Sequence, residues 1–306
     1  MTKIAFMFPG QGSMEAGMGR EVAEAVPEAM AVFDEASDAA RMDLKDLCFH
    51  RPVEDLVDTE VQQPALVTTC LSLDAALRTR GVRPHVVVGH SVGEFSALGA
   101  ADSLSIRDAI ALVRERGIAM AEAAKAHPGS MAAILGLADE AVEALCQKIH
   151  NVWPANYNCP GQLVISGETV SVDEAIDEAT REGARRAVKL RVSGAFHSPL
   201  VGRAAERLRP AVERVHLAQG KAAFMSTVTA KVEDAQRYRE GLIEQLTAPV
   251  RFTQAARALI ADGVTTFVVV GPGGVLGGLL KRIDKSVRTF SVSDLKSLDE
   301  VTQALG

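Results

Sequence analysis

Three apolar runs in the sequence each stop at a glycine-rich turn and are followed by a helical pattern. Lys3 to Phe8 leads into Pro-Gly-Gln-Gly, Val86 to Val88 into Gly-His-Ser-Val-Gly, and Thr265 to Val270 into Gly-Pro-Gly-Gly. Short apolar runs without polar alternation are typical of strands that are buried on both faces. Strands that alternate with helices predict a mainly parallel sheet with helices on both sides, an α/β fold.

The pattern changes between residues 129 and 191. A strand begins near Met131, and the following segments have the patterns of a helix, two strands, a second helix and a third strand after it. The order β-α-β-β-α-β is that of a ferredoxin-like α+β subdomain. We therefore predict a core formed by residues 1–128 and 192–306 and an inserted subdomain formed by residues 129–191.

The charge balance narrows the choice of partners. The 306 residues include 33 Lys and Arg against 39 Asp and Glu, a formal net charge of -6. Because the chain also has no dense basic run, nucleic acid is not an expected partner. An anionic substrate must then be met by a local cation. The 4 cysteines form no C-x-x-C pair, which is typical of reduced thiols in a cytosolic protein.

Two apolar stretches raise the question of a targeting or membrane segment. The N-terminal stretch turns at Pro9 and Gly10 and is too short for the core of a signal peptide. Gly263 to Leu280 approaches membrane-spanning length, but Gly-Pro-Gly-Gly interrupts its middle. We expect a soluble, cytoplasmic protein that does not bind a membrane.

The pentad Gly-His-Ser-Val-Gly has the context of a nucleophile elbow. It follows a valine strand and precedes a helical pattern, so Ser91 stands in the turn from strand to helix. The flanking glycines leave room for a strained turn, and the helix N-terminus offers N–H groups to a developing oxyanion. Ser91 is therefore the candidate nucleophile. The alternative is a simple helix-capping turn with Ser91 as N-cap.

Among the 7 histidines, His197 has the position best suited to activate the serine. It follows a strand, at the end where a parallel α/β sheet builds its site. His90 is adjacent to Ser91 and is interpreted as a support of the turn. His85 and His90 have no carboxylate or cysteine cluster nearby, so we predict no metal site.

Two more residues stand out by their surroundings. Gln11 is a polar side chain between two glycines, which allow a ligand to approach the backbone closely. The phosphate-binding pattern G-x-x-x-x-G-K-[ST] is absent. Arg116 lies in an otherwise apolar helical pattern after the elbow helix. It is either a surface arginine, like Arg114, or a bidentate partner for a carboxylate in the cleft.

A set of motifs spans essentially the whole chain: FPGQGS, GHSVGEFSAL, RERGIAM, NYNCPGQLVISG, GAFHSPL, QLTAPVRF and GPGGVLGGLLKRI. In this order and spacing they resemble the malonyl-CoA:acyl carrier protein transacylases, a family that includes the acyltransferase domains of fatty acid and polyketide synthases. The resemblance implies a hydrolase-like α/β core with an inserted ferredoxin-like subdomain. This fold agrees with the pattern of strands and helices.

The resemblance also implies a role for each matching residue. Ser91 would be the acylated nucleophile and His197 its base. Gln11 and the backbone N–H of Val92 would form the oxyanion hole, and Arg116 would bind the free carboxylate of the malonyl group. The phosphopantetheine thiol of a holo acyl carrier protein would then attack the malonyl-serine ester. The implied reaction is a ping-pong transfer from malonyl-CoA that needs no cofactor.

Other matching positions have supporting roles. Gln245 corresponds to the residue whose main-chain carbonyl orients the histidine. Asn158 matches a position close to the site, and Gln162 and Arg186 match positions associated with coenzyme A. An esterase would instead place an acid between the serine and the histidine, and the candidates are Asp139, Asp173 and Asp177.

Phe196 bears on the choice of acyl group. In the related polyketide domains a phenylalanine directly before the histidine accompanies malonyl, and a smaller residue accompanies methylmalonyl. Phe196 thus indicates a malonyl-type site, unless it is ordinary core packing.

Three other functions remain to be weighed. A serine hydrolase would use water as acceptor, but it has no need of Arg116. A non-catalytic module that binds carrier proteins would not need Ser91, His197 and Arg116 together. A stand-alone acyltransferase that serves a polyketide synthase cannot be separated by sequence from the fatty acid enzyme. We expect a monomer.

Overall fold

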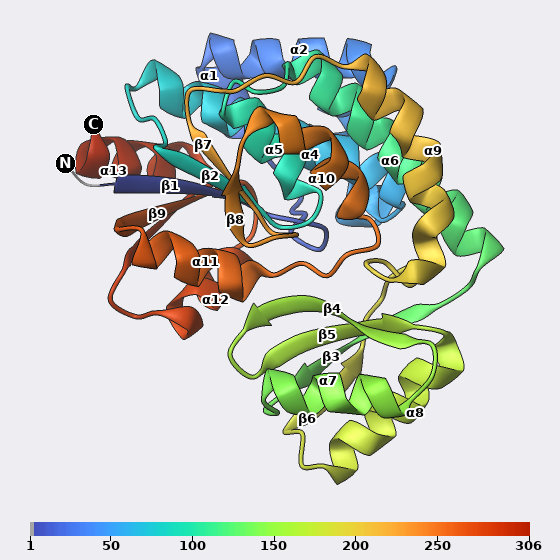
Figure 1. Ribbon diagram of the computed structural model, residues 1–306. Coiled ribbons are helices and arrows are strands. Elements are labelled where there is room, and N and C mark those ends of the chain that lie inside the picture. Colours follow the sequence, from blue (N-terminus) through green and yellow to red (C-terminus); the bar gives the residue numbers. More distant parts are fainter. Residues whose placement is uncertain (1–2) are drawn as a thin grey trace.

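The computed structural model describes residues 3–306, and a six-stranded sheet forms the centre of its larger part (Figure 1). The strands are β1 (Lys3–Phe8), β2 (Val86–Gly89), β7 (Ala223–Ser226), β8 (Lys231–Glu233), β9 (Val264–Val270) and β10 (Arg288–Val292). Their order across the sheet is β10-β9-β1-β2-β7-β8. Only β8 runs antiparallel to its neighbour, so the prediction of a mainly parallel sheet is confirmed.

Successive side chains of the central strands enter two different apolar cores. In β1, Ile4, Phe6 and Phe8 pack into one core, and Ala5 and Met7 pack into the other. Because helices cover both faces of the sheet, no position of this strand after Lys3 faces water. This two-sided burial is the physical cause of the unbroken apolar runs in the sequence.

Two groups of helices provide the covering layers (Figure 1). One face is covered by α11 (Phe252–Ala261) and α12 (Val275–Ile283). The helices whose apolar side chains pack into the other core are α1 (Arg20–Ala25), α2 (Pro27–Ala40), α3 (Leu44–Phe49), α4 (Thr59–Thr79), α5 (Gly93–Ala100), α6 (Ile106–Ala126), α9 (Gly202–Arg214), α10 (Ala235–Glu244) and α13 (Leu295–Leu305), with the 3-10 turns η1 (Val53–Leu56) and η2 (Pro199–Val201). Within residues 3–306, none of these helices combines the length and apolar character that a membrane crossing requires.

A second, antiparallel sheet forms the smaller part of the molecule. Its elements are β3 (Ser130–Leu135), α7 (Asp139–Lys148), β4 (Val152–Cys159), β5 (Gln162–Gly167), α8 (Thr169–Arg181) and β6 (Arg186–Lys189). The strand order is β4-β5-β3-β6, and α7 and α8 pack with the sheet around a separate apolar core. The predicted fold class, an α/β core with an inserted ferredoxin-like α+β part, is confirmed. We propose residues 129–191 as the bounds of the insertion.

The strand β4 joins the smaller sheet to the core. The N–H of Val250 donates to the carbonyl of Ala155, and the N–H of Tyr157 donates to the carbonyl of Val250, both at 2.8 Å. The hydroxyl of Thr253 donates to the carbonyl of Tyr157 at 3.1 Å. These bonds hold β4 against the core, and two of its alternating side chains, Asn156 and Asn158, line the cavity between the two sheets.

Some elements differ from the sequence pattern. The apolar spacing of residues 20–40 predicts one helix, but the backbone is extended at Val26 and a new helix begins at Pro27. Proline is favoured in the first turn of a helix because its missing N–H would have no partner there. The short strand β8 and the C-terminal helix α13 have no counterpart among the predicted elements.

Candidate active site

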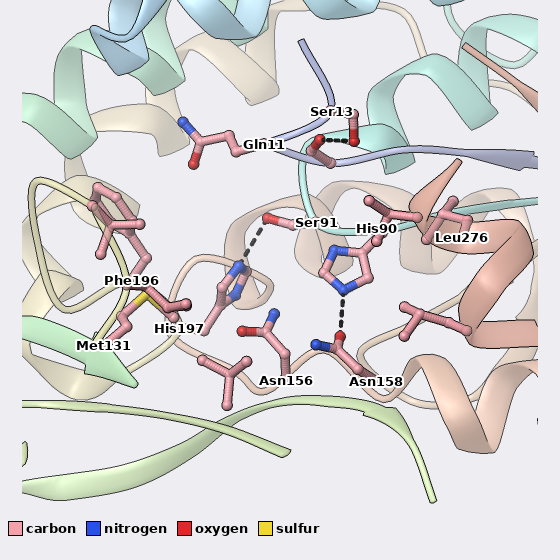
Figure 2. Close-up of a pocket in the computed structure, with 16 residues that line it drawn as sticks. Gln11, Ser13, His90, Ser91, Met131, Asn156, Asn158, Phe196, His197 and Leu276 are labelled. Carbon is pink, nitrogen blue, oxygen red and sulfur yellow. Dashed lines mark hydrogen bonds between the residues drawn. The ribbon is translucent and has the colours of Figure 1, made fainter. Parts of the chain in front are cut away.

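A cavity of about 180 Å³ lies between the two sheets, and Ser91 is on its wall (Figure 2). The core contributes the turns after β1 and β2, the segment that holds His197 and part of α12, and the smaller part contributes residues of β3, β4 and β5. The polar side chains that line the cavity are those of Gln11, Ser13, His90, Ser91, Asn156, Asn158 and His197.

The turn between β2 and α5 is the predicted nucleophile elbow. Ser91 has a φ of 54°, in the left-handed region that non-glycine residues rarely adopt. A Cβ atom at Gly89 would lie 2.0 Å from the carbonyl carbon of Gly93, and one at Gly93 would lie 2.3 Å from the carbonyl oxygen of Phe8. Both glycines are therefore required by close backbone approach. The N-cap of α5 is Val92, so Ser91 is not a capping residue.

His197 is held against the serine with a defined tautomer. Its Nε2 lies 2.8 Å from Ser91 Oγ, and its Nδ1 lies 2.8 Å from the carbonyl oxygen of Gln245 and 3.1 Å from that of Ala248. Carbonyls only accept, so Nδ1 carries the proton and Nε2 is free to accept the serine proton. The place that an acid would take in an esterase is filled by main-chain carbonyls. The candidate acids lie elsewhere, on α7 and α8: Asp139, Asp173 and Asp177.

The surroundings of His197 keep its imidazole neutral. Burial, followed by the nearby Arg116 guanidinium and His90, lowers the pKa of His197 to about 3, against the smaller opposing effect of the two carbonyls. A neutral imidazole can accept a proton. The base is therefore in its active form throughout the neutral range.

Arg116 is fully buried on α6, and its guanidinium contacts the hydroxyl of Ser91. Its Nη2 donates to Ser91 Oγ at 3.1 Å and to Gln245 Oε1 at 3.0 Å, and its Nη1 donates to Gln63 Oε1 at 2.7 Å. Burial lowers the pKa of Arg116 to about 10, which leaves the guanidinium charged at neutral pH. The surface alternative for this residue is excluded.

Within residues 3–306, no carboxylate forms a hydrogen bond with Arg116. Both amides that hold it are neutral, and its Nε has no partner within residues 3–306. A buried cation without an anion is costly unless another group compensates it. The arrangement is suited to a carboxylate that arrives with a substrate.

Two main-chain N–H groups near the serine are free. Those of Gln11 and Val92 donate to no other group in the part of the chain that the structure describes, residues 3–306. The side-chain amide of Gln11 donates to Thr59 Oγ1 at 2.6 Å and points away from Ser91 (Figure 2). At Gln11, the main-chain N–H is thus the group left available for an oxyanion.

His90, next to the serine, contacts Asn158 of the smaller sheet. Its Nε2 lies 2.9 Å from Asn158 Oδ1, as Figure 2 shows. Burial lowers the pKa of His90. The His90–Asn158 bond therefore ties the elbow turn to β4 of the smaller sheet.

Comparison with known proteins agrees with this geometry. Residues 5–299 match the family described as "Acyl transferase domain". The malonyl CoA-acyl carrier protein transacylase of Bacillus subtilis is 44% identical, over 100% of this chain and 98% of the relative. The chain belongs to the malonyl-CoA:acyl carrier protein transacylase family.

Solved structures of this family superpose closely. The malonyl-CoA:acyl carrier protein transacylase of Xanthomonas oryzae matches with a TM-score of 0.96 at 40% identity, over 100% of this chain and 99% of that one. A complex of a malonyl-transacylase with a type II polyketide synthase acyl carrier protein matches with a TM-score of 0.95 at 36% identity, over 99% and 100% of the two chains.

The transacylase resemblance also implied roles for Phe196, Gln162 and Arg186, and the structure places only the first of these at the cavity. Phe196 is buried and lines the cavity. Gln162 and Arg186 both lie beside Leu135, on the two strands that flank β3, and neither lines the cavity. Gln162 accepts a hydrogen bond from Arg282 Nη1 at 2.7 Å, and Arg186 is exposed.

The sequence did not single out Gln63 and Glu94, two buried residues that hold this transacylase site together. Gln63 accepts from Arg116, and Glu94 contacts Gln245. Gln63 precedes a proline in an apolar helix, and Glu94 follows the elbow among apolar residues. A polar residue on an otherwise buried helix face was the available signal in both cases.

Proposed function

We propose that this chain transfers the malonyl group of malonyl-CoA to the phosphopantetheine thiol of an acyl carrier protein through a malonyl ester on Ser91. One observation carries the proposal: Ser91 Oγ lies 2.8 Å from the Nε2 of a neutral histidine and 3.1 Å from the buried guanidinium of Arg116. The histidine activates the hydroxyl, and the guanidinium selects an acyl group that bears an acid.

The first half-reaction begins at the hydroxyl. His197 Nε2 takes the proton of Ser91 as the oxygen attacks the thioester carbonyl. The N–H groups of Gln11 and Val92 stabilise the oxyanion. The bond between carbon and sulfur breaks, and the proton on His197 passes to the sulfur of the departing coenzyme A.

The second half-reaction reverses these roles. The thiol of the carrier protein gives its proton to His197 and attacks the ester carbonyl. The bond to Ser91 breaks, and the proton returns to the serine oxygen. No step requires a cofactor.

Arg116 would pair with the free carboxylate of the malonyl group. The pair forms at a buried guanidinium, so an acyl group that lacks the carboxylate leaves the charge unpaired at a cost of about 2–5 kcal/mol. Phe196 limits the space beside the acyl group, which favours malonyl over methylmalonyl.

The roles of Gln162 and Arg186 are proposed more broadly. Both lie at one end of the smaller sheet, outside the cavity, where the coenzyme A portion would extend from the thioester. Asn158 would act through His90, which it contacts.

Transfer and acylation are tested together. After incubation with malonyl-CoA, mass spectrometry of the wild-type chain should find one malonyl group on Ser91, and the Ser91→Ala variant should remain unmodified. Labelled malonate should then move to a holo acyl carrier protein. An unmodified Ser91 would rule out the mechanism, and release of free malonate in place of transfer would favour a hydrolase.

The polyketide alternative is supported by the complex with a polyketide carrier protein among the matched structures. It predicts faster transfer to a carrier protein of polyketide synthesis than to the fatty acid carrier protein of the same cell. Equal or slower transfer would favour the fatty acid role.

A further inference from the structure

Gln245 contacts the functional side chains His197 and Arg116. It also contacts the buried acid Glu94. Its main-chain carbonyl accepts from His197 Nδ1, and its side-chain Oε1 accepts from Arg116 Nη2 at 3.0 Å. Its Nε2 donates to Glu94 Oε2 at 2.9 Å. Gln245 is 2% exposed, so water does not substitute for any of these partners.

Glu94 uses both of its carboxyl oxygens. Oε2 accepts from Gln245, and Oε1 accepts from the N–H of Thr227 at 2.7 Å and from its hydroxyl at 2.8 Å. The side chain is 1% exposed on the first turn of α5, three positions after Ser91. Burial raises the pKa of Glu94 to about 7, and Arg116 acts in the opposite direction.

The arrangement of donors around Glu94 determines which hydrogen-bonding groups the side chain at position 94 must present. A guanidinium only donates, so the amide of Gln245 must turn its oxygen to Arg116 and its NH₂ to Glu94. The N–H of Thr227 is also a fixed donor. Position 94 must therefore present two acceptor atoms. A carboxyl group does so whether or not it is protonated, because its proton can go to Thr227 Oγ1, which also lies 3.3 Å from the carbonyl of Gly89.

We propose that Glu94 is a positioning residue that, through Gln245, holds Arg116 in place for the acyl carboxylate and so sets the preference for malonyl over neutral acyl groups. The inference rests on the proposed role of Arg116. Glu94 is also the acid that the Gln245 amide links to the buried guanidinium, and this intervening amide keeps its carboxyl group from occupying the place of the substrate.

The Glu94→Gln variant tests the proposal with almost no change in volume. A glutamine has one acceptor, so one of the two fixed donors is left facing an NH₂ group. When the amide of Gln245 turns to relieve this conflict, its NH₂ faces Arg116 and releases the guanidinium. The ratio of kcat/KM for malonyl-CoA to that for acetyl-CoA should fall about tenfold to a hundredfold. The main-chain contact of Gln245 with His197 remains, so Ser91 should still be acylated by acetyl-CoA.

The double variant with Glu94→Gln and Gln245→Glu separates positioning from simple stability. It restores a donor for each acceptor: the new amide accepts from Thr227 and donates to the new carboxylate, which accepts from Arg116. The melting temperature should recover relative to Glu94→Gln. The malonyl preference should stay low, because a carboxylate now occupies Arg116 in competition with the substrate. Recovery of both quantities would mean that Glu94 has only a structural role.

Two further variants complete the test. Asp74→Asn changes another buried carboxyl group, which pairs with Arg78, and should leave the acyl ratio unchanged. If Glu94→Gln does not fold, Gln245→Met keeps the main-chain carbonyl and should lower the ratio in the same way. An unchanged ratio in folded Glu94→Gln, together with a lowered ratio in Arg116→Ala, would overturn the role of Glu94 but not that of Arg116. An unchanged ratio in Arg116→Ala would overturn the proposed role of Arg116 itself.

Discussion

At the scale of single residues, His197 departs strongly from its behaviour in water. Burial, Arg116 and His90 hold its pKa at about 3, and only the neutral imidazole can act as base. We therefore expect kcat/KM for malonyl-CoA to stay level as the pH falls from about 8 to about 5.5, whereas an ordinary histidine would lose activity around pH 6.5. Steady-state rates over this range, with the fold checked by circular dichroism, provide the measurement.

The Arg116→Ala variant supplies the control for this pH profile. Loss of the cation removes one cause of the lowered pKa of His197, while burial remains. With acetyl-CoA as substrate for both proteins, the acid limb of the variant should lie at higher pH than that of the wild type. A wild-type profile with a midpoint near 6.5 would show that His197 is more exposed to water than its contacts indicate.

At the scale of elements, the elbow between β2 and α5 depends on two glycines that permit close backbone packing. A Cβ at Gly93 would lie 2.3 Å from the carbonyl oxygen of Phe8, so Gly93→Ala must push the elbow away from β1. We expect a loss of about 3 kcal/mol or more in the free energy of unfolding and no acylation of Ser91. Chemical unfolding and mass spectrometry measure the two effects.

A glycine in a helix without such contacts is the matched control. Gly278 lies in α12, and no atom is within 4 Å of a Cβ placed there. Gly278→Ala should raise the free energy of unfolding by about 0.5–1 kcal/mol, because alanine has the higher helix propensity. Equal destabilisation by both substitutions would contradict the explanation of the elbow by backbone contact.

The elements also show what a sequence can predict. Apolar runs buried on two faces and a strand-turn-helix around Ser91 follow from local patterns, so the parallel core strands and the order of helices and strands in the smaller part were predicted. The position of Arg116 was predicted only through the family resemblance, because a helical pattern does not say which neighbour covers a given face. Gln63 contacts a residue that is 53 positions away in the sequence, and Glu94 contacts one that is 151 positions away. No local pattern contains that information.

At the scale of the whole molecule, a buried acid far from the proposed chemistry makes global stability depend on pH. Asp74 on α4 is 4% exposed. Its Oδ2 accepts from Arg78 Nε at 2.6 Å, and its Oδ1 has no hydrogen-bond partner within residues 3–306. Arg78 also donates to Asp102 and to the carbonyl of Ala100, so the pair ties α4 to the end of α5. Burial raises the pKa of Asp74 from 3.8 to about 6, against the attraction of Arg78.

The sign of the effect follows from proton binding. Between pH 4 and 6 the folded state holds the Asp74 proton and the unfolded state does not, so the free energy of unfolding falls as the pH rises. Asp74→Asn removes this titration. The stability of the wild type relative to the variant should therefore decrease by up to about 3 kcal/mol between pH 4 and pH 7, with most of the change below pH 6. Urea unfolding of both proteins at a series of pH values measures the difference, and two parallel curves would mean that Asp74 is ionised in the folded protein throughout this range.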